Sequence, residues 1–197
     1  MGSVNVGVPE KLTQFLGERY GIENFIETGT YLGDTSAWAA KVFKRVFTIE
    51  ASKDLYSQAL IKNGSNSNIQ FNHGHTKQFL ANLVPQLEQP SLFWLDAHWS
   101  GGVTYGSDDQ CPLLEEIRLI NTSSTIHFLL IDDARLFLYP PPPPQNPLNW
   151  PSIDEVIRVI QAQDKDIYVC VFEDVIFAVP SYAKADLMTY LHRVQFQ

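Results

Sequence analysis

Apolar runs and helical patterns alternate along most of the chain. Apolar runs bounded by turn residues predict strands, here at 24–27, 46–50, 69–71, 91–96 and 127–133. Apolar residues that recur every three or four positions predict helices, here at 9–20, 52–63, 79–87, 112–120, 152–160 and 182–193, with a further helix after Gly33. This alternation indicates an α/β fold with a largely parallel sheet.

The end of the chain departs from this alternation. Apolar strands at 167–172 and 175–179 are separated only by Glu173 and Asp174, which allows an antiparallel hairpin and no crossover. We therefore expect one doubly wound, seven-stranded sheet, mostly parallel, with an antiparallel terminal hairpin. Residues 1–197 are expected to form one domain, with a leading helix within 1–22 and a C-terminal helix within 181–197.

Composition limits the partners that we expect. The 197 residues are 45% hydrophobic, carry a formal net charge of −8 and include only 14 lysines and arginines, which are scattered, so nucleic acid is not an expected partner. No apolar run approaches the roughly 20 residues of a membrane span, and the two cysteines have no metal or redox spacing. These features predict a soluble cytoplasmic protein that does not bind membranes.

The first predicted strand leads into a glycine turn. It ends at Glu27, and Gly29 and Gly33 permit positive φ and a close approach of a ligand, while a side chain from 34–36 can cap the helix that follows. Tyr31 stands where the dinucleotide fingerprint has its second glycine, so a pyrophosphate would meet a side chain. The turn therefore favours a ligand without phosphate, and the acid before it favours a cationic one.

The second strand ends in Glu50, where a carboxylate can accept hydrogen bonds from both hydroxyls of a ribose. A ribose, a positive charge and no phosphate together suggest S-adenosylmethionine. The alternative that the turn alone leaves open is a glycine-rich strand-to-helix connection that holds no ligand.

The stretch from Glu27 to Gly33, with Glu50 after the next strand, resembles the class I S-adenosylmethionine-dependent methyltransferases. It differs from their commonest motif in Tyr31 and in a last glycine one place early. The strand order with a terminal hairpin is similar to their seven-stranded sheet. The resemblance implies that the cofactor-binding residues are Glu27, Thr28, Gly29, Thr30, Gly33, Glu50, His75 and Asp96.

Three carboxylates, Asp96, Asp132 and Asp133, follow the fourth and fifth strands. Carboxylate oxygens suit Mg²⁺ and similar cations, and the arrangement is similar to the metal site of catechol-type and natural-product sugar O-methyltransferases. We therefore expect these residues to bind Mg²⁺ or another divalent cation. An alternative is that one of Asp132 and Asp133 instead caps a loop or pairs with Arg135.

His98, two residues after Asp96, is the candidate general base, because imidazole titrates near neutral pH. Metal-assisted O-methylation of a small-molecule hydroxyl is then the expected function. If His98 instead ligates metal together with Asp96 and Asp132, the site resembles a metal-dependent hydrolase. A third possibility is a non-catalytic module that only binds adenosylmethionine.

The long segments 97–111 and 134–151 are expected to shape the acceptor pocket. Their aromatic residues suggest a flat face for a sugar or a phenol: Trp99, Tyr105, Tyr139 and Trp150. The run Pro140 to Pro144 predicts an extended polyproline segment, either a stiff surface strap or a docking ligand. The apolar face of the C-terminal helix can pack on the domain or on a second copy, so a homodimer is possible.

Overall fold

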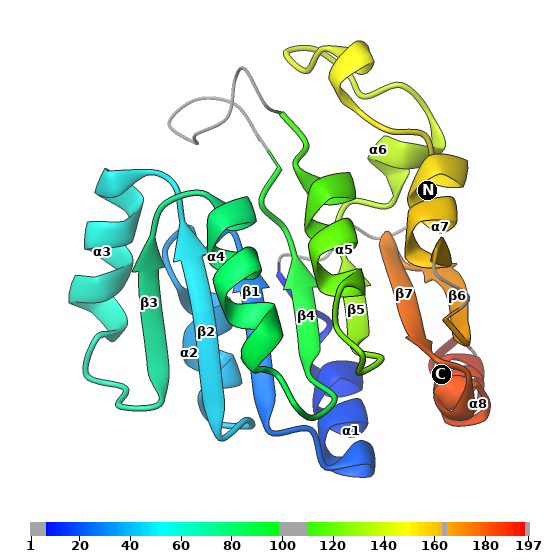
Figure 1. The fold of residues 1–197 in the computed structure, drawn as a ribbon, viewed down its shortest axis with the longest axis horizontal. Coiled ribbons are helices and arrows are strands. Elements are labelled where there is room, and N and C mark those ends of the chain that lie inside the picture. Colours follow the sequence, from blue (N-terminus) through cyan, green and yellow to red (C-terminus); the bar gives the residue numbers. More distant parts are fainter. Residues whose placement is uncertain (1–6, 99–109, 163–164, 196–197) are drawn as a thin grey trace.

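The computed structural model describes residues 7–98, 110–162 and 165–195, and these build the predicted sheet (Figure 1). Its strand order is β3-β2-β1-β4-β5-β7-β6. The strands are β1 (Asn24–Thr28), β2 (Arg45–Glu50), β3 (Ile69–His73), β4 (Leu92–Leu95), β5 (Phe128–Ile131), β6 (Ile167–Phe172) and β7 (Val175–Pro180). Trp99 and Tyr105, predicted to line the acceptor pocket, lie outside the described residues.

Strands β1 to β5 pair in parallel, whereas β7 pairs antiparallel with both β5 and β6. The prediction of a seventh, antiparallel strand is therefore confirmed. Because β7 runs opposite to β5, its first residues lie beside the carboxyl end of β5, where Ile176 pairs with Ile131. The turn between β6 and β7 consequently reaches the edge of the sheet at which the parallel strands end.

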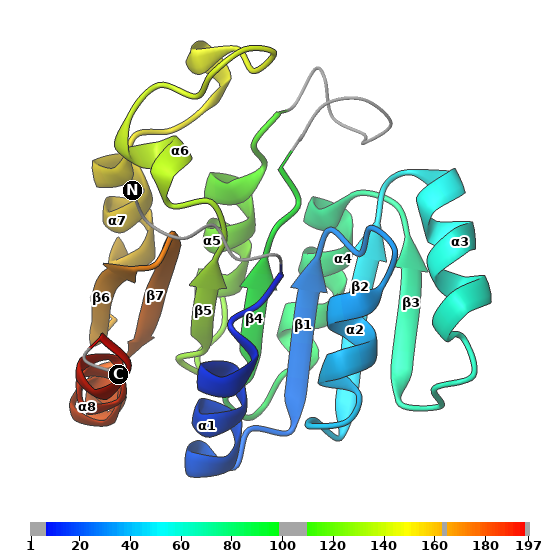
Figure 2. The same ribbon diagram turned by 180° about the vertical axis from the view of Figure 1, so that it is seen from behind.

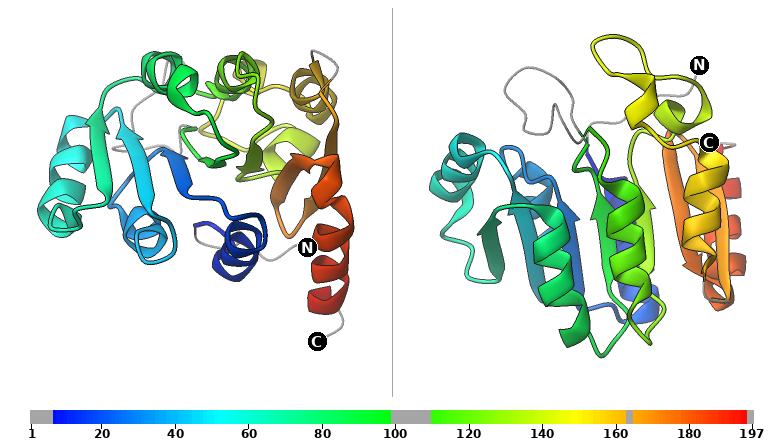
Figure 3. Two further views of the ribbon diagram at one scale, coloured as in Figure 1. Left: turned by 60° about the horizontal axis from the view of Figure 1, so that its bottom comes forward. Right: turned by 45° about the horizontal axis from the view of Figure 1, so that its top comes forward.

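Helices cover both faces of the sheet. Helices α4 (Thr76–Leu83), α5 (Leu113–Asn121) and α7 (Ile153–Ile160) lie on one face (Figure 1). The other face is covered by α1 (Glu10–Tyr20), α2 (Asp34–Ala39) and α8 (Lys184–Gln195) (Figure 2). Helix α3 (Lys53–Asn63) lies at the β3 edge, and the left view of Figure 3 shows the helices on the two sides of the sheet. The remaining short helices are α6 (Arg135–Leu138), η1 (Val84–Gln86), η2 (Pro147–Asn149) and η4 (Ser181–Ala183).

The central strands are continuous apolar runs because both of their faces are buried. In β4, Leu92 and Trp94 pack toward α1, α2 and α8, whereas Phe93 and Leu95 pack toward α4, α5 and α7. All four are at most 2% exposed. No helix in the described part of the chain is long and apolar enough to cross a membrane.

Two expectations about local structure need correction. Helix α2 is not capped by a side chain from 34–36, because its N-cap is Gly33, which has φ of 77° and makes no side-chain bond. The proline run is not extended throughout, because it turns at Pro143 and Pro144, which are joined by a cis peptide bond. By contrast, Ser152 forms the expected N-terminal cap of α7, as part of a capping box.

Candidate functional site

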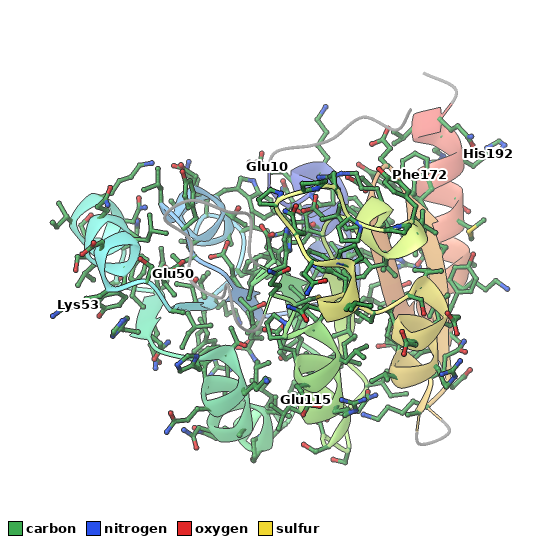
Figure 4. The ribbon with its side chains drawn as sticks, turned by 90° about the horizontal axis from the view of Figure 1, so that it is seen from above. Glu10, Glu50, Lys53, Glu115, Phe172 and His192 are labelled. Carbon is green, nitrogen blue, oxygen red and sulfur yellow. The ribbon has the colours of Figure 1, made fainter. Side chains whose placement is uncertain are left out.

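The loops after β1, β2, β4 and β5 meet at the carboxyl edge of the sheet, where ligands bind in folds of this kind. The sheet order changes direction between β1 and β4, which are neighbours in the sheet. From β1 the chain continues toward β2 on one side, and from β4 it continues toward β5 on the other side. Figure 4 looks onto this edge and shows Glu50 at the end of β2, close to α3. The predicted cofactor turn and the predicted catalytic residues thus lie at the same edge.

The turn after β1 passes three times through the left-handed region, at Gly29 (φ 86°), Tyr31 (φ 49°) and Gly33 (φ 77°). A Cβ atom on Gly29 would lie 2.5 Å from the backbone oxygen of Asp96, so only glycine fits there. At Tyr31 the side chain is 54% exposed. The departure from glycine at that position therefore leaves the turn intact and places an aromatic ring on its outer surface.

Glu50 ties two loops together at the edge. Its carboxylate accepts hydrogen bonds from the backbone N–H of Tyr31 and of Ser52, both at 2.8 Å. Glu50 is 7% exposed. Each carboxylate oxygen has a further lone pair, so the side chain retains the capacity to accept a ribose hydroxyl.

Glu27 lies inside the protein, beneath the turn. Its Oε2 accepts hydrogen bonds from the hydroxyls of Thr48 (2.7 Å) and Ser36. Burial raises its pKa from 4.5 to about 7, although both hydroxyls oppose the shift. Thr28 and Thr30 are buried as well, so all three of these predicted cofactor residues are largely shielded from solvent in this structure.

His75 is exposed at the N-cap of α4. It borders a hollow of about 370 Å³ between β2, β3 and α4. The hollow adjoins the cofactor edge, since the backbone N–H of Gly74 bonds to the carbonyl oxygen of Glu50. The predicted place of His75 near the cofactor is therefore compatible with its position.

The predicted base His98 lies among the predicted metal ligands. Its Nε2 is 2.5 Å from Oδ2 of Asp133, and its Nδ1 is 3.5 Å from Oδ1 of Asp96, which is beyond an ordinary hydrogen bond. Burial alone would lower the His98 pKa, but the hydrogen bond to Asp133 and the neighbouring carboxylates raise it. The ring also meets the edge of Trp150, 5.4 Å between centroids.

The carboxylates have unequal environments. Burial and repulsion by Asp133 raise the pKa of Asp132 to about 7. Burial raises the pKa of Asp96 well above its ordinary value, with His98 opposing and the other carboxylates adding. Asp133 has a lowered pKa, because His98 and Arg135 outweigh the effect of burial.

These residues do not form the predicted Mg²⁺ site in the arrangement seen here. Oδ1 of Asp133 accepts a hydrogen bond from Arg135 (2.5 Å) and Oδ2 contacts Nε2 of His98, so both oxygens already have partners within the protein. Within residues 7–98, 110–162 and 165–195, no group of three or more histidine, cysteine, aspartate or glutamate side chains could hold a metal ion. The alternative pairing of Asp133 with Arg135 is confirmed.

Trp150 was expected to offer a face to the acceptor. Instead it is 8% exposed and packs between His98 and Phe137. It therefore supports the position of His98. Tyr139, 55% exposed, is the aromatic residue of this segment that faces outward.

Sequence reasoning missed the groups that hold the site from below. Ser36 and Thr48 bind Glu27, and Asp174 in the β6–β7 turn binds Arg135. One signal was present for Asp174: a two-residue hairpin turn needs positive φ, and this one has no glycine.

Comparison with known proteins gives the fold. No protein-family model matches the chain, and no curated protein matches it. The O-methyltransferase TomG from Streptomyces achromogenes, crystallised with SAM, is 18% identical with a TM-score of 0.61, over 90% of this chain and 82% of that chain. The O-methyltransferase from Bacillus cereus in complex with SAH is 18% identical with a TM-score of 0.63, over 90% and 84%. The SAH-bound Podospora anserina methyltransferase PaMTH1 is 14% identical with a TM-score of 0.61, over 89% and 79%.

The predicted class I methyltransferase fold is thus confirmed: the seven-stranded sheet with its antiparallel β7 matches solved O-methyltransferases along nearly the whole chain.

Proposed function

We propose that this protein is an S-adenosylmethionine-dependent O-methyltransferase that acts on a hydroxyl of a small molecule. The observation that supports this most is the meeting of the glycine turn, Glu50 and the His98–Asp133 pair at one edge of a methyltransferase fold. The structural neighbours crystallised with SAM or SAH support the choice of cofactor.

In this proposal, the turn at Gly29 to Gly33 binds the amino-acid end of the cofactor and Glu50 accepts its ribose hydroxyls. When bound, adenosylmethionine would supply a methyl group attached to a positively charged sulfur. The acceptor oxygen would bond to the methyl carbon as the bond from that carbon to sulfur breaks, leaving a neutral thioether. His98 acts as the general base. Asp133 holds the hydrogen on Nε2, so Nδ1 is the nitrogen that accepts the hydroxyl proton.

The raised pKa of His98 gives this step a pH dependence. Nδ1 accepts a proton only when the ring is neutral, so methyl transfer should increase as pH rises through the His98 pKa. A requirement for a divalent cation remains a prediction from the sequence, without support in the arrangement of Asp96, Asp132 and Asp133. An assay with a chelator tests whether methyl transfer requires one.

The test combines calorimetry with an assay of methyl transfer from labelled adenosylmethionine to catechol and to simple glycosides, each with and without EDTA. Binding and transfer that persist in EDTA support the reaction through His98. Methyl transfer that is lost in EDTA and recovered on addition of Mg²⁺ supports metal-assisted O-methylation instead. Binding without transfer to any acceptor favours the non-catalytic module, and no binding of adenosylmethionine overturns the proposal.

A further inference from the structure

The turn between β6 and β7 reaches into the candidate active site. Its two residues, Glu173 (φ 47°) and Asp174 (φ 72°), are both left-handed, as a two-residue hairpin turn requires. Asp133 is also left-handed, with φ of 56°. Such conformations are unfavourable for residues other than glycine and persist only where the surroundings impose them.

Asp174 makes three contacts with the segment that follows Asp133. Its backbone oxygen accepts a hydrogen bond from the N–H of Ala134 (2.8 Å), and its Oδ1 accepts one from the N–H of Arg135 (2.7 Å). Its Oδ2 forms an ion pair with the Arg135 guanidinium. The Asp174 side chain is only 8% exposed, whereas the Arg135 side chain is 34% exposed, so this pair is partly shielded from water.

The same guanidinium nitrogen of Arg135 also donates to Oδ1 of Asp133. This leaves Oδ2 of Asp133 for Nε2 of His98. The result is a continuous chain of ion pairs and hydrogen bonds from Asp174 through Arg135 and Asp133 to His98. It joins the β6–β7 turn, the start of α6 and the loops after β5 and β4.

We propose that Asp174 is a positioning residue of the active site. It holds Arg135 against one oxygen of Asp133, so that the other oxygen is aimed at His98. By balancing the charge of Arg135, it also leaves Asp133 a stronger acceptor for the His98 N–H. This inference rests on the proposed role of His98, and it extends the site to a turn that touches neither cofactor nor acceptor.

The chain offers a closely matched pair of variants. Asp174→Asn removes the charge, while asparagine adopts positive φ readily and retains an oxygen for the N–H of Arg135. Glu173→Asn removes a charge from the same turn, but Glu173 is exposed and is not part of this chain of contacts. Both variants lose one negative charge and have asparagine in the turn, but only Asp174→Asn changes a contact with Arg135.

The first measurement is the proton NMR signal of the His98 Nε2–H in the ¹⁵N-labelled full-length protein, assigned by its absence in His98→Gln. We expect Asp174→Asn to move this signal upfield or lose it to exchange, and Glu173→Asn to leave it in place. Methyl transfer should fall roughly 10- to 100-fold in Asp174→Asn, since misplacing a reacting group by about 1 Å can cost that much. Adenosylmethionine affinity should not change.

A double-mutant cycle adds a second measurement. If Asp174 acts through Arg135, then Asp174→Asn should have no further effect on the His98 signal in an Arg135→Gln background. An unchanged signal in Asp174→Asn, equal damage from Glu173→Asn, or additive effects in the cycle would each overturn the proposal. The signal is independent of turnover, so a protein that transfers no methyl group would refute the proposed function and still test the role of Asp174.

Discussion

The buried carboxyl of Glu27 should make the stability of this protein depend on pH in an unusual direction. Its pKa is raised from 4.5 to about 7 in the folded protein. One pKa unit corresponds to about 1.4 kcal/mol, so the difference amounts to about 3 kcal/mol. The substitution Glu27→Gln replaces the titrating carboxyl by a neutral amide and retains an oxygen that can accept hydrogen bonds from the hydroxyls of Ser36 and Thr48.

The sign follows from the protons bound in each state. Below pH 4.5 the Glu27 carboxyl is protonated in both the folded and the unfolded protein, and it has no effect on the pH dependence. Between pH 4.5 and 7 the unfolded chain loses this proton while the folded protein retains it, so stability falls as pH rises. Above pH 7 the folded protein holds a buried carboxylate and the loss is complete.

The assay is denaturant unfolding of wild type and Glu27→Gln at a series of pH values from 5 to 8. The difference in the free energy of unfolding between Glu27→Gln and wild type should shift in favour of Glu27→Gln as pH rises, by up to about 3 kcal/mol across this range. Glu23→Gln is a suitable control, because the Glu23 pKa is lowered by Lys44 and its transition lies below this range. Curves for Glu27→Gln and wild type that remain parallel from pH 5 to 8 would refute the reasoning.

Three further outcomes are expected. Glu50→Ala should weaken adenosylmethionine binding by calorimetry about 10- to 150-fold, equivalent to 1.5–3 kcal/mol for charge-assisted hydrogen bonds; unchanged affinity would remove Glu50 from the site. Gly29→Ala should lower the free energy of unfolding by about 2–5 kcal/mol, from the left-handed backbone and the clash with the Asp96 carbonyl, and an equally stable variant in denaturant melts would contradict this. His98→Gln should reduce methyl transfer by about 10²- to 10⁴-fold with adenosylmethionine affinity intact, and a variant with full activity would exclude His98 as the base.

The features that the sequence predicts well are those that short stretches determine. Continuous apolar runs such as β4 specify a strand buried on both faces, and the two-residue link before Val175 forces a hairpin. The sequence predicts Gly29 as a tight point of the turn. It does not reveal the cause, which is the backbone of Asp96 just after the neighbouring strand β4.

The orientation of Glu27 was partly predictable. It shares a face of β1 with Phe25, which is fully buried, because side chains alternate along a strand. That spacing indicates that Glu27 points into the layer beneath α2, where its carboxylate meets Ser36. Its partner Thr48 lies directly opposite on β2, a pairing that depends on strand register and is not contained in either segment alone.

The pairing of the carboxylates lay beyond the sequence for a similar reason. A divalent cation, a histidine and an arginine are all good partners for Asp133, and spacing along the chain does not choose among them. The choice depends on where separate loops converge in space, to within the length of a hydrogen bond. Two of those loops follow parallel strands. The third is the β6–β7 turn, for which the sequence predicts only that it connects the two strands of a hairpin.

The antiparallel β7 gives this turn its importance. In a wholly parallel sheet, the residues that precede a strand lie at the amino edge, opposite the ligand site, so they cannot contribute to it. Reversal of β7 places the residues before Val175 at the carboxyl edge, beside the end of β5. Asp174 is thereby brought within hydrogen-bonding distance of Arg135 and can act on Asp133 from the side away from His98. In this protein the reversed strand therefore supplies the edge of the candidate site with one more loop than the parallel strands alone could provide.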